Sequence, residues 1–311
     1  MKKKIFIDGK AGTTVLRIFE RLSERDDVEL IVLSDDERKD PAARKRALNS
    51  CDIAFLCLPD DAAREAVSMI DSPEVVVIDA STAHRTESGW SYGFPELSES
   101  FENAVKTSKR IANPGCHASG FIALVYPLIE AGVLSADALL TCHSITGYSG
   151  GGKKMIADYE SEERDVLLDY PRQYGITQMH KHLKEMKHVT GIENAPVFSP
   201  IVSDFYSGMA VTVPIFTKQL ADGTTLETVK DIYRKKYTSE IVKYVDSCDD
   251  GGFLSAGVLA GSDAMWVTAY GNDDRIILVA LYDNLGKGAS GAAVECMNIV
   301  MGEDPAKGLV L

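Results

Sequence analysis

Short, unbroken apolar runs in the first part of the chain constrain its fold most. They occupy residues 4–7, 29–33, 53–58 and 75–79. Helical stretches separate them, such as Leu16 to Leu22 and Ala62 to Ile70. A strand that is apolar along its whole length must be buried on both faces, as in a parallel sheet covered by helices on both sides. The sequence therefore predicts the α/β class, with a doubly wound nucleotide-binding domain of the Rossmann type.

A glycine turn connects the first apolar run to the first helical stretch. Its residues are Asp8, Gly9, Lys10, Ala11, Gly12, Thr13 and Thr14. Gly9 and Gly12 let the backbone approach a pyrophosphate, whose charge the N-terminus of the following helix favours. The pattern is GxxGxxV, with Val15 where a third glycine often packs helix on strand. An ordinary strand-turn-helix connection is the alternative for this turn alone.

The ends of the other runs supply further cofactor candidates. The second run ends at Ser34, where an adenosine ribose would lie, and Ser34 with Arg38 could hold the 2′-phosphate of NADP. The acidic residues at positions 35–37 weaken that preference. Leu58, Pro59 and Ser81 follow later runs, at carboxyl ends of strands where ligands bind in such sheets. Strand-end capping is the alternative interpretation of those three.

A cysteine stands on the turn Asn113-Pro114-Gly115-Cys116, directly before a long apolar run. A thiol at a helix N-terminus lies in the field of unpaired backbone N–H groups, so its thiolate is stabilised and its pKa falls below the free value of about 8.5. This placement predicts a nucleophile; a buried, inert cysteine is the alternative. The chain has 6 cysteines, and no CxxC or Cys/His spacing of a zinc site occurs in the sequence, so we expect no metal.

Composition limits the classes of protein to which the chain can belong. Its 311 residues, 45% hydrophobic and 25% charged, suffice for two globular domains. The net charge of −13 argues against binding to nucleic acid or to an acidic membrane surface. Asp8 ends the first apolar run too early for a signal peptide or a membrane span. We therefore expect a cytoplasmic protein with reduced thiols, in which an anionic substrate needs local capture.

Further motifs occur along the chain in a definite order. They are DASTAHR at 79–85, YGFPEL at 92–97, NPGC at 113–116, GYSGGGK at 147–153, HKHLKE at 180–185 and NLGKGASG at 284–291. Together they resemble the N-acetyl-gamma-glutamyl-phosphate reductases in their shorter form, within the wider group that contains aspartate-semialdehyde dehydrogenases. The chain departs from that family at His117-Ala118-Ser119, where an aromatic residue and a Pro-Thr pair are common, and at Lys184, where proline is common. Neither departure removes a chemical group that the reaction needs.

The resemblance implies an NADPH-dependent reduction of N-acetyl-glutamyl phosphate to its semialdehyde, a step of arginine biosynthesis. Cys116 would attack the acyl phosphate, and the resulting thioester would accept hydride. His180 or His182 would act as the acid/base, with Glu185 placed to orient an imidazole. The sequence does not choose between the two histidines, and a solvated basic surface is the alternative for this segment. His117 ranks lower because consecutive side chains at a helix start diverge.

The anionic groups of such a substrate need cations or N–H donors. The candidates are Arg85, Arg110, Asn113, Ser149, Gly150 and Lys153. Ser149 and Gly150 belong to a run that can form a backbone anion nest or a flexible lid. The resemblance further implies cofactor contacts near the nicotinamide from Asn284, Lys287 and Gly288.

The expected organisation has an NADP-binding domain at 1–116, an α+β substrate and oligomerisation domain at 117–283, and a C-terminal helix at 284–311 that returns to the nucleotide domain. The resemblance implies a homodimer or homotetramer acting on a small acyl phosphate. Two other hypotheses remain. One keeps the mechanism but acts on aspartyl phosphate or a carrier-linked aminoadipyl phosphate. The other is a non-enzymatic dinucleotide-binding sensor with an unreactive Cys116.

Overall fold

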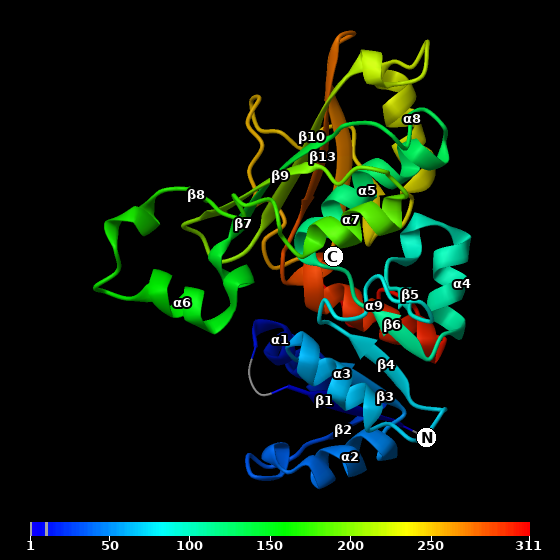
Figure 1. The fold of residues 1–311 in the computed structure, drawn as a ribbon, viewed down its shortest axis with the longest axis vertical. Coiled ribbons are helices and arrows are strands. Elements are labelled where there is room, and N and C mark those ends of the chain that lie inside the picture. The colour runs from blue at the N-terminus through cyan, green and yellow to red at the C-terminus, as the bar shows by residue number, and fades with distance from the viewer. Residues whose placement is uncertain (1, 10–11) are drawn as a thin grey trace. The chain divides into compact units, whose positions relative to one another are not determined.

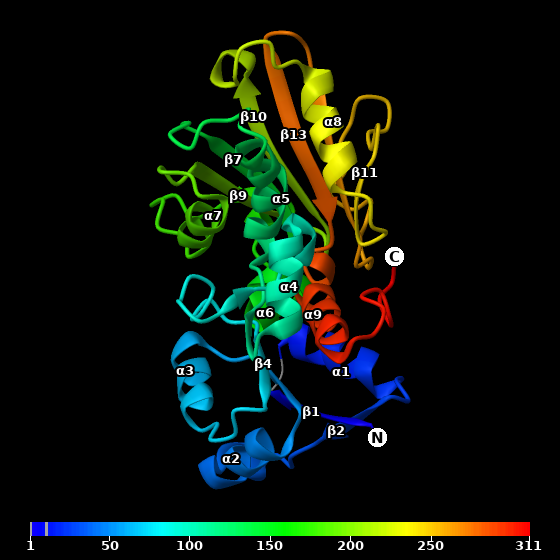
Figure 2. The same cartoon turned by 90° about the vertical axis from the view of Figure 1, so that its right-hand side faces the viewer.

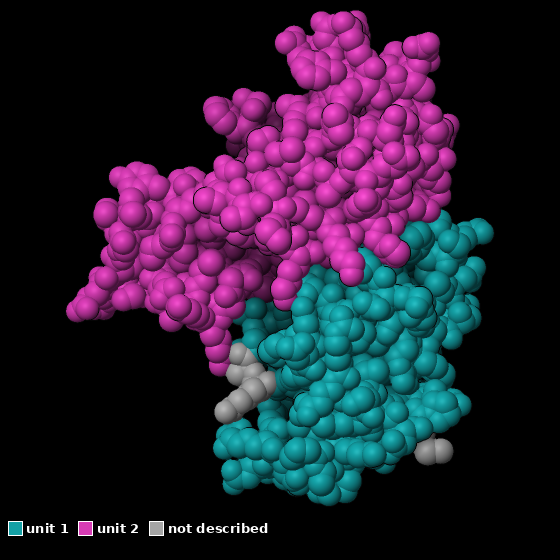
Figure 3. Space-filling view, in the orientation of Figure 1, with its two compact units in different colours: residues 1–114, 289–309 teal, residues 115–288, 310–311 magenta. Residues whose placement is uncertain are grey.

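The computed structural model describes residues 2–9 and 12–311, which form two compact units (Figure 3). Unit 1 contains the residues up to Pro114 together with Ala289–Leu309. Unit 2 contains Gly115–Gly288 and Val310–Leu311. The sequence predicts divisions after residues 116 and 283, and the units divide after 114 and 288. In the described ranges, no helix is long and apolar enough to cross a membrane.

Unit 1 is built on a 6-stranded sheet with the order β2-β1-β3-β4-β6-β5. All of its strand pairs are parallel. The strands are β1 (Lys3–Asp8), β2 (Val28–Ile31), β3 (Ile53–Leu56), β4 (Val76–Asp79), β5 (Ser91–Tyr92) and β6 (Arg110–Ala112). Every residue of β3 and β4 is buried, as the continuous apolar runs require.

Helices cover both faces of this sheet (Figure 1). They are α1 (Thr13–Ser23), α2 (Pro41–Ser50), α3 (Asp60–Ser68), α4 (Glu99–Thr107) and α9 (Gly291–Met301), with short 3₁₀ turns η1 (Glu37–Lys39) and η2 (Pro95–Leu97). Alternate residues of β1 enter different cores: Ile5 packs with α1 and α9, and Phe6 packs with α2 and α3. The predicted doubly wound α/β domain is thereby confirmed.

Unit 2 is built on a mixed 7-stranded sheet with the order β11-β12-β13-β10-β7-β9-β8. Its strands are β7 (Thr141–Gly147), β8 (Arg172–Gln173), β9 (Val197–Ser203), β10 (Met209–Phe216), β11 (Val242–Tyr244), β12 (Met265–Gly271) and β13 (Arg275–Tyr282). Its helices are α5 (Cys116–Glu130), α6 (Gly152–Glu160), α7 (His182–Thr190) and α8 (Leu226–Lys236). Short turns complete it at η3 (Tyr148–Gly151), η4 (Val166–Asp169) and η5 (Thr217–Gln219), and a π-helical turn, η6 (Gly286–Ser290), precedes α9.

One face of the second sheet is buried under helices α5 and α8, which contact β10, β12 and β13 (Figure 2). The strands alternate accordingly. In β7, Cys142 and Ser144 are buried, whereas His143 and Ile145 lie on the opposite, exposed face. This alternation is typical of a sheet with only one face against a core, and it confirms the predicted α+β class of the second domain.

Candidate active site

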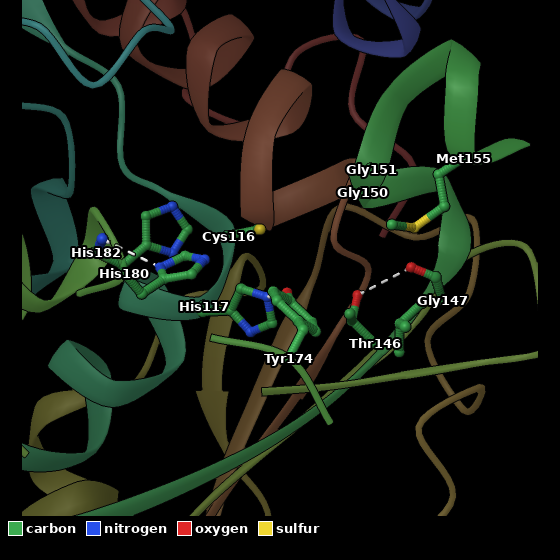
Figure 4. Close-up of a pocket in the computed structure, with 11 residues that line it drawn as sticks. Cys116, His117, Thr146, Gly147, Gly150, Gly151, Met155, Tyr174, His180 and His182 are labelled. Carbon is green, nitrogen blue, oxygen red and sulfur yellow. Dashed lines mark hydrogen bonds between the residues drawn. The ribbon is translucent and has the colours of Figure 1, made fainter. Parts of the chain in front are cut away.

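A cavity of about 230 Å³ in unit 2 collects most of the chemically reactive side chains predicted from the sequence (Figure 4). Its lining consists of Cys116, His117, Thr146, Gly147, Gly150, Gly151, Met155, Tyr174, His180, His182 and Val202. The structure thus brings together Cys116, His180, His182 and Gly150, which the sequence names as site residues. It adds Met155, Tyr174 and Val202, for which the sequence carries no signal.

Cys116 is the first residue of α5, and three features hold its backbone in place. The preceding Gly115 is the N-cap and makes no side-chain cap hydrogen bond, so Cys116 lies in the field of the α5 N-terminus. The Gly115 N–H itself donates to Glu185 Oε1 at 2.7 Å. Gly288 lies against the cysteine, because a Cβ on Gly288 would stand 3.1 Å from Cys116 Cβ. A side chain at 288 would displace the thiol.

The other cysteines have a different environment. Burial raises the pKa of Cys51 and of Cys57 to about 12. Burial also raises the pKa of Cys142 and Cys248 above the ordinary value. These thiols stay protonated near neutral pH and are poor nucleophiles. Cys116 therefore remains the thiol whose placement suits attack on a substrate.

The two histidines of the HKHLKE motif face the same cavity from the start of α7. His182 is the first residue of that helix, and its backbone N–H donates to His180 Nδ1 at 3.2 Å. The ring centroids are 4.7 Å apart. Burial, and next the nearby Lys181, lower the pKa of His180. His180 is therefore neutral at pH 7, and with Nδ1 accepting a hydrogen bond its proton lies on Nε2.

His117 also lines the cavity, although the sequence argument ranks it below the other two histidines. Its Nδ1 lies 2.6 Å from Ser144 Oγ, and its Nε2 lies 2.6 Å from the Tyr174 hydroxyl. Burial, and next His180, lower its pKa to about 3. Because both ring nitrogens have hydrogen-bond partners and the ring is neutral, His117 shapes the wall of the cavity and is not placed to transfer a proton. No local pattern predicts this, because Ser144 and Tyr174 come from distant β7 and from the segment after β8.

The glycine-rich turn η3 contributes backbone rather than side chains to the cavity. Ser149 is buried, and its Oγ accepts a hydrogen bond from Asn284 Nδ2 at 3.0 Å. Asn284 Oδ1 in turn accepts the Gly208 N–H at 3.0 Å, so Asn284 fixes the turn to the start of β10. Gly150 remains at the cavity wall, whereas Lys153 lies exposed in the first turn of α6.

The substrate-site candidates Arg85, Arg110 and Asn113 belong to unit 1, where they lie at two different edges of the sheet. Arg85 is buried, and its guanidinium donates to the carbonyls of Asn113, at 2.9 Å, and Ala80, at 3.1 Å. Asn113 follows the carboxyl end of β6 and donates from Nδ2 to the Ala289 carbonyl at 2.9 Å. Arg110 begins β6, at the amino edge, and donates to the Val75 carbonyl at 2.9 Å. The structure therefore separates Arg110 from Arg85 and Asn113.

The start of α1 has the features that a pyrophosphate requires. A Cβ on Gly9 would stand 2.8 Å from the Cys57 carbonyl oxygen, so only glycine fits there. Gly12 is the N-cap of α1 and makes no side-chain hydrogen bond, which leaves the N–H groups of Thr13 and Thr14 to a ligand. The strand order reverses between β1 and β3, where ligands bind in such sheets. Lys10 and Ala11 of the same turn lie outside the described residues.

The remaining cofactor candidates of unit 1 already have partners of their own. Ser34 donates two hydrogen bonds to Glu37, one from its backbone N–H and one from its Oγ to Oε2 at 2.7 Å. Together, the backbone bond first, they lower the pKa of Glu37. Arg38 donates to the carbonyls of Leu33 and Gly9 at 3.0 and 3.2 Å, at the carboxyl ends of β2 and β1. Ser81 donates from Oγ to Asp79 Oδ2 at 2.7 Å.

Leu58 and Pro59 follow β3, and Pro59 is the N-cap of α3. Lys287 is almost completely buried in the turn η6.

Comparison with known proteins gives two family models that match successive parts of the chain. The family described as "Semialdehyde dehydrogenase, NAD binding domain" matches residues 4–104, and "Semialdehyde dehydrogenase, dimerisation domain" matches residues 116–284. The N-acetyl-gamma-glutamyl-phosphate reductase 2 of Nostoc sp. is 44% identical over 99% of both chains. The N-acetyl-gamma-glutamyl-phosphate reductase of Rhizobium meliloti is 45% identical over 97% of this chain and 99% of its own. The chain belongs to the N-acetyl-gamma-glutamyl-phosphate reductase family.

Solved structures of the wider group share the fold of this reductase family member. Aspartate semialdehyde dehydrogenase II of Vibrio cholerae matches with a TM-score of 0.73 at 16% identity, over 97% of this chain and 99% of its own. The aspartate semialdehyde dehydrogenase of Candida albicans, crystallised with NADP, matches with a TM-score of 0.66 at 15% identity over 97% and 99%. At such identities the likeness concerns the fold alone.

Proposed function

We propose that this protein is an NADPH-dependent N-acetyl-gamma-glutamyl-phosphate reductase that forms N-acetyl-glutamate 5-semialdehyde and phosphate in arginine biosynthesis. One observation carries the proposal: Cys116, at an N-terminus without a side-chain cap, shares a cavity with His180 and His182. Full-length relatives at 44–45% identity that bear this name support the substrate.

The thiolate of Cys116 starts the reaction. Its Sγ attacks the acyl carbon, the bond from that carbon to the phosphate oxygen breaks, and phosphate leaves with the electron pair. The thioester that remains on Cys116 is electrophilic enough to accept hydride, whereas an oxygen ester is less so. Protonation and collapse of the thiohemiacetal then release the aldehyde and restore the thiolate. The N–H groups at the start of α5 stabilise both the thiolate and the oxyanion.

The acid/base is His180 or His182. His117 is unsuited, because both its ring nitrogens are bonded and its pKa of about 3 keeps it neutral. In this neutral tautomer His180 offers an Nε2–H that can donate a hydrogen bond to the oxyanion of the tetrahedral intermediate. We propose that Glu185 acts in the same site by holding the Gly115 N–H, and so the turn that carries Cys116.

We propose that NADP(H) binds at the carboxyl edge of the sheet in unit 1. The backbone from Gly9 to Thr14 would hold the pyrophosphate, Ser34 and Arg38 the 2′-phosphate, and Leu58, Pro59 and Ser81 the remaining contacts. Bound NADPH supplies the hydride for the thioester. By family resemblance, Asn284, Lys287 and Gly288 are assigned to the nicotinamide half, with Gly288 also keeping the space beside Cys116 open.

The cavity wall favours an acylated amine over a free one. Within the described residues, its lining contains no carboxylate that would pair with an α-ammonium group. Met155 (Figure 4) and Val202 instead line the cavity and offer an apolar surface for the acetyl methyl. This argues for N-acetyl-glutamyl phosphate over aspartyl phosphate. We propose that Ser149, Gly150 and Lys153 assist with the substrate carboxylate, and that Arg85 and Asn113 assist with the phosphate, while Arg110 lies at the other sheet edge.

We propose further that the protein is a cytoplasmic homodimer or homotetramer. The description of the family that matches residues 116–284 supports self-association. The sheet face opposite α5 supports it too, because Ile145, Val197, Phe216 and Ile277 are exposed there. Sedimentation analysis tests this: a single species with the 33.8 kDa mass of one chain refutes it.

The decisive experiment measures NADP reduction by the purified protein with N-acetyl-glutamate semialdehyde, with and without phosphate, and with aspartate semialdehyde as the competing substrate. Reduction that requires phosphate and the acetylated substrate supports the proposal. Activity with aspartate semialdehyde alone would move the substrate to that of the sister enzymes. No reduction with either refutes the proposed substrate, and a carrier-linked substrate or a non-enzymatic sensor then becomes the hypothesis to pursue.

A further inference from the structure

Tyr282, the last residue of β13, reaches into the first turn of α5 with its hydroxyl. The hydroxyl donates to the Cys116 carbonyl at 2.5 Å and accepts the Gly120 N–H at 3.0 Å. In a regular α-helix the Gly120 N–H would donate directly to the Cys116 carbonyl, four residues earlier. The buried phenol of Tyr282 therefore contacts both the carbonyl of Cys116 and the N–H of Gly120, the two groups that pair at the start of a helix.

The entry of this hydroxyl depends on the residue at 120. A Cβ on Gly120 would stand 2.7 Å from Tyr282 Oη and 2.6 Å from Val211 Cγ2, so only glycine admits the phenol and the neighbouring strand. Burial raises the pKa of Tyr282 well above its ordinary value, and the phenol therefore remains a donor across the whole working pH range. The contact joins the backbone of Cys116 to the sheet rather than to a loop.

Two other tyrosines bond to α5 without touching its first turn. The Tyr237 hydroxyl donates to the Ala123 carbonyl at 2.6 Å, and the Tyr233 hydroxyl donates to the Leu124 carbonyl at 2.7 Å. Like Tyr282, Tyr233 is fully buried. It therefore provides a matched control, since its phenol contributes a buried hydrogen bond to the same helix, but away from Cys116.

We propose that Tyr282 is a positioning residue for the nucleophile: its hydroxyl ties the Cys116 carbonyl and the Gly120 N–H to β13 and sets where the Cys116 thiol stands relative to the sheet. This rests on the proposed role of Cys116. Without the hydroxyl, the Cys116 carbonyl loses its hydrogen bond to the sheet, and the thiol on the same residue shifts with it. A displacement of about 1 Å at a reacting atom costs about 100-fold in rate.

The test compares Tyr282→Phe with Tyr233→Phe. Each variant loses one buried phenol, at a stability cost that thermal unfolding measures. The rate of Cys116 alkylation by iodoacetamide, followed by peptide mass spectrometry, needs no substrate, and kcat and KM for semialdehyde oxidation are measured beside it. We expect Tyr282→Phe to slow alkylation at least 3-fold and to lower kcat about 10- to 100-fold with little change in KM, while Tyr233→Phe leaves both rates unchanged.

Equal alkylation rates in the two variants and the wild type would overturn the proposal, because a merely structural phenol affects stability and not thiol chemistry. Absence of turnover in the wild type would refute the proposed function instead, and the alkylation rates would still decide the role of Tyr282. Where Tyr282→Phe does not fold, 4-fluorophenylalanine at 282 fills nearly the same volume without a hydrogen-bond donor; an alkylation rate equal to that of wild type then refutes the positioning role.

Discussion

Gln178 anchors the loop that leads to His180 and His182, the proposed acid/base candidates, and its replacement is the most informative perturbation outside the cavity. Its backbone φ is +56°, which is an unusual conformation for a residue with a side chain. The side-chain amide makes two hydrogen bonds with the backbone of Phe198 in β9: Nε2 donates to the carbonyl and Oε1 accepts the N–H, each at 2.8 Å. The Phe198 ring lies 5.2 Å from that of His180. The strained backbone of Gln178 therefore lies close to the cavity that contains His180.

Gln178→Glu removes one donor with almost no change of shape. The carboxylate can still accept the Phe198 N–H, but its other oxygen then faces the Phe198 carbonyl without a proton. Losing one net hydrogen bond and placing a carboxylate beside the part-buried Phe198 carbonyl costs about 1 kcal/mol, because position 178 is exposed and water screens the charge. For a unit of this size, that lowers the melting temperature by roughly 2–4 °C.

The pH dependence of this loss provides a control within the same variant. A carboxyl group that faces a carbonyl oxygen favours its protonated form, so its folded-state pKa is raised above the unfolded value. The protonated form regains a donor, and the stability deficit is then smallest at low pH and grows as pH rises through the raised pKa. Gln178→Gly is the matched variant, because it relieves the positive φ but loses both bonds.

Thermal unfolding from pH 5 to 8, hydrogen exchange over residues 174–182 and kcat measure the effect. We expect faster exchange in this segment and a reduced kcat at pH 8 in Gln178→Glu, because the histidines lose their support. If the variant matches the wild type in melting temperature, exchange and kcat at pH 8, the anchoring role of Gln178 is refuted.

Three further predictions concern the proposed chemistry. Cys116→Ser should abolish turnover and leave NADPH binding, measured by fluorescence titration, nearly unchanged; retained activity would contradict a covalent thioester. Glu37→Gln should raise the preference for NADPH over NADH a few-fold, because the carboxylate bonded to Ser34 would repel a 2′-phosphate; an unchanged ratio of kcat/KM values would place the phosphate elsewhere. Because burial lowers the pKa of His180, its imidazole stays neutral as pH falls through 6.5, and an acid limb of kcat/KM that reports its protonation should lie below that value; a limb above it would contradict a role for His180.

Much of the proposed site can be named from the sequence, for a local reason. Cys116 lies on a turn before an apolar helix, and His180 and His182 lie in a short motif, so neighbours along the chain identify them. Their shared cavity depends on α7 beginning at His182, which a pattern of histidines alone leaves open. His117 ranks below the other two histidines as a base, yet it lines the same cavity, because the divergence of consecutive side chains does not prevent both Cys116 and His117 from facing it.

The boundaries of elements were predicted less well than their existence. The apolar run at 53–58 contains a strand that ends at Leu56, and the helical stretch at 62–70 becomes α3 at Asp60–Ser68. The N-cap of α8 is Thr225, whose hydroxyl accepts the Thr228 N–H. Caps and turns decide such ends, and hydrophobic periodicity does not report them.

The sequence by itself determined the parallel sheet, the position of the proposed nucleophile and the family, because burial pattern and turn chemistry act over a few neighbouring residues. Tertiary structure alone decided which distant side chains meet. Ser144 and Tyr174 flank the His117 ring, the Tyr282 phenol enters α5, and the Gln178 amide pairs with a strand. These contacts depend on strand register and on the path of loops, and neither leaves a periodic trace in the sequence.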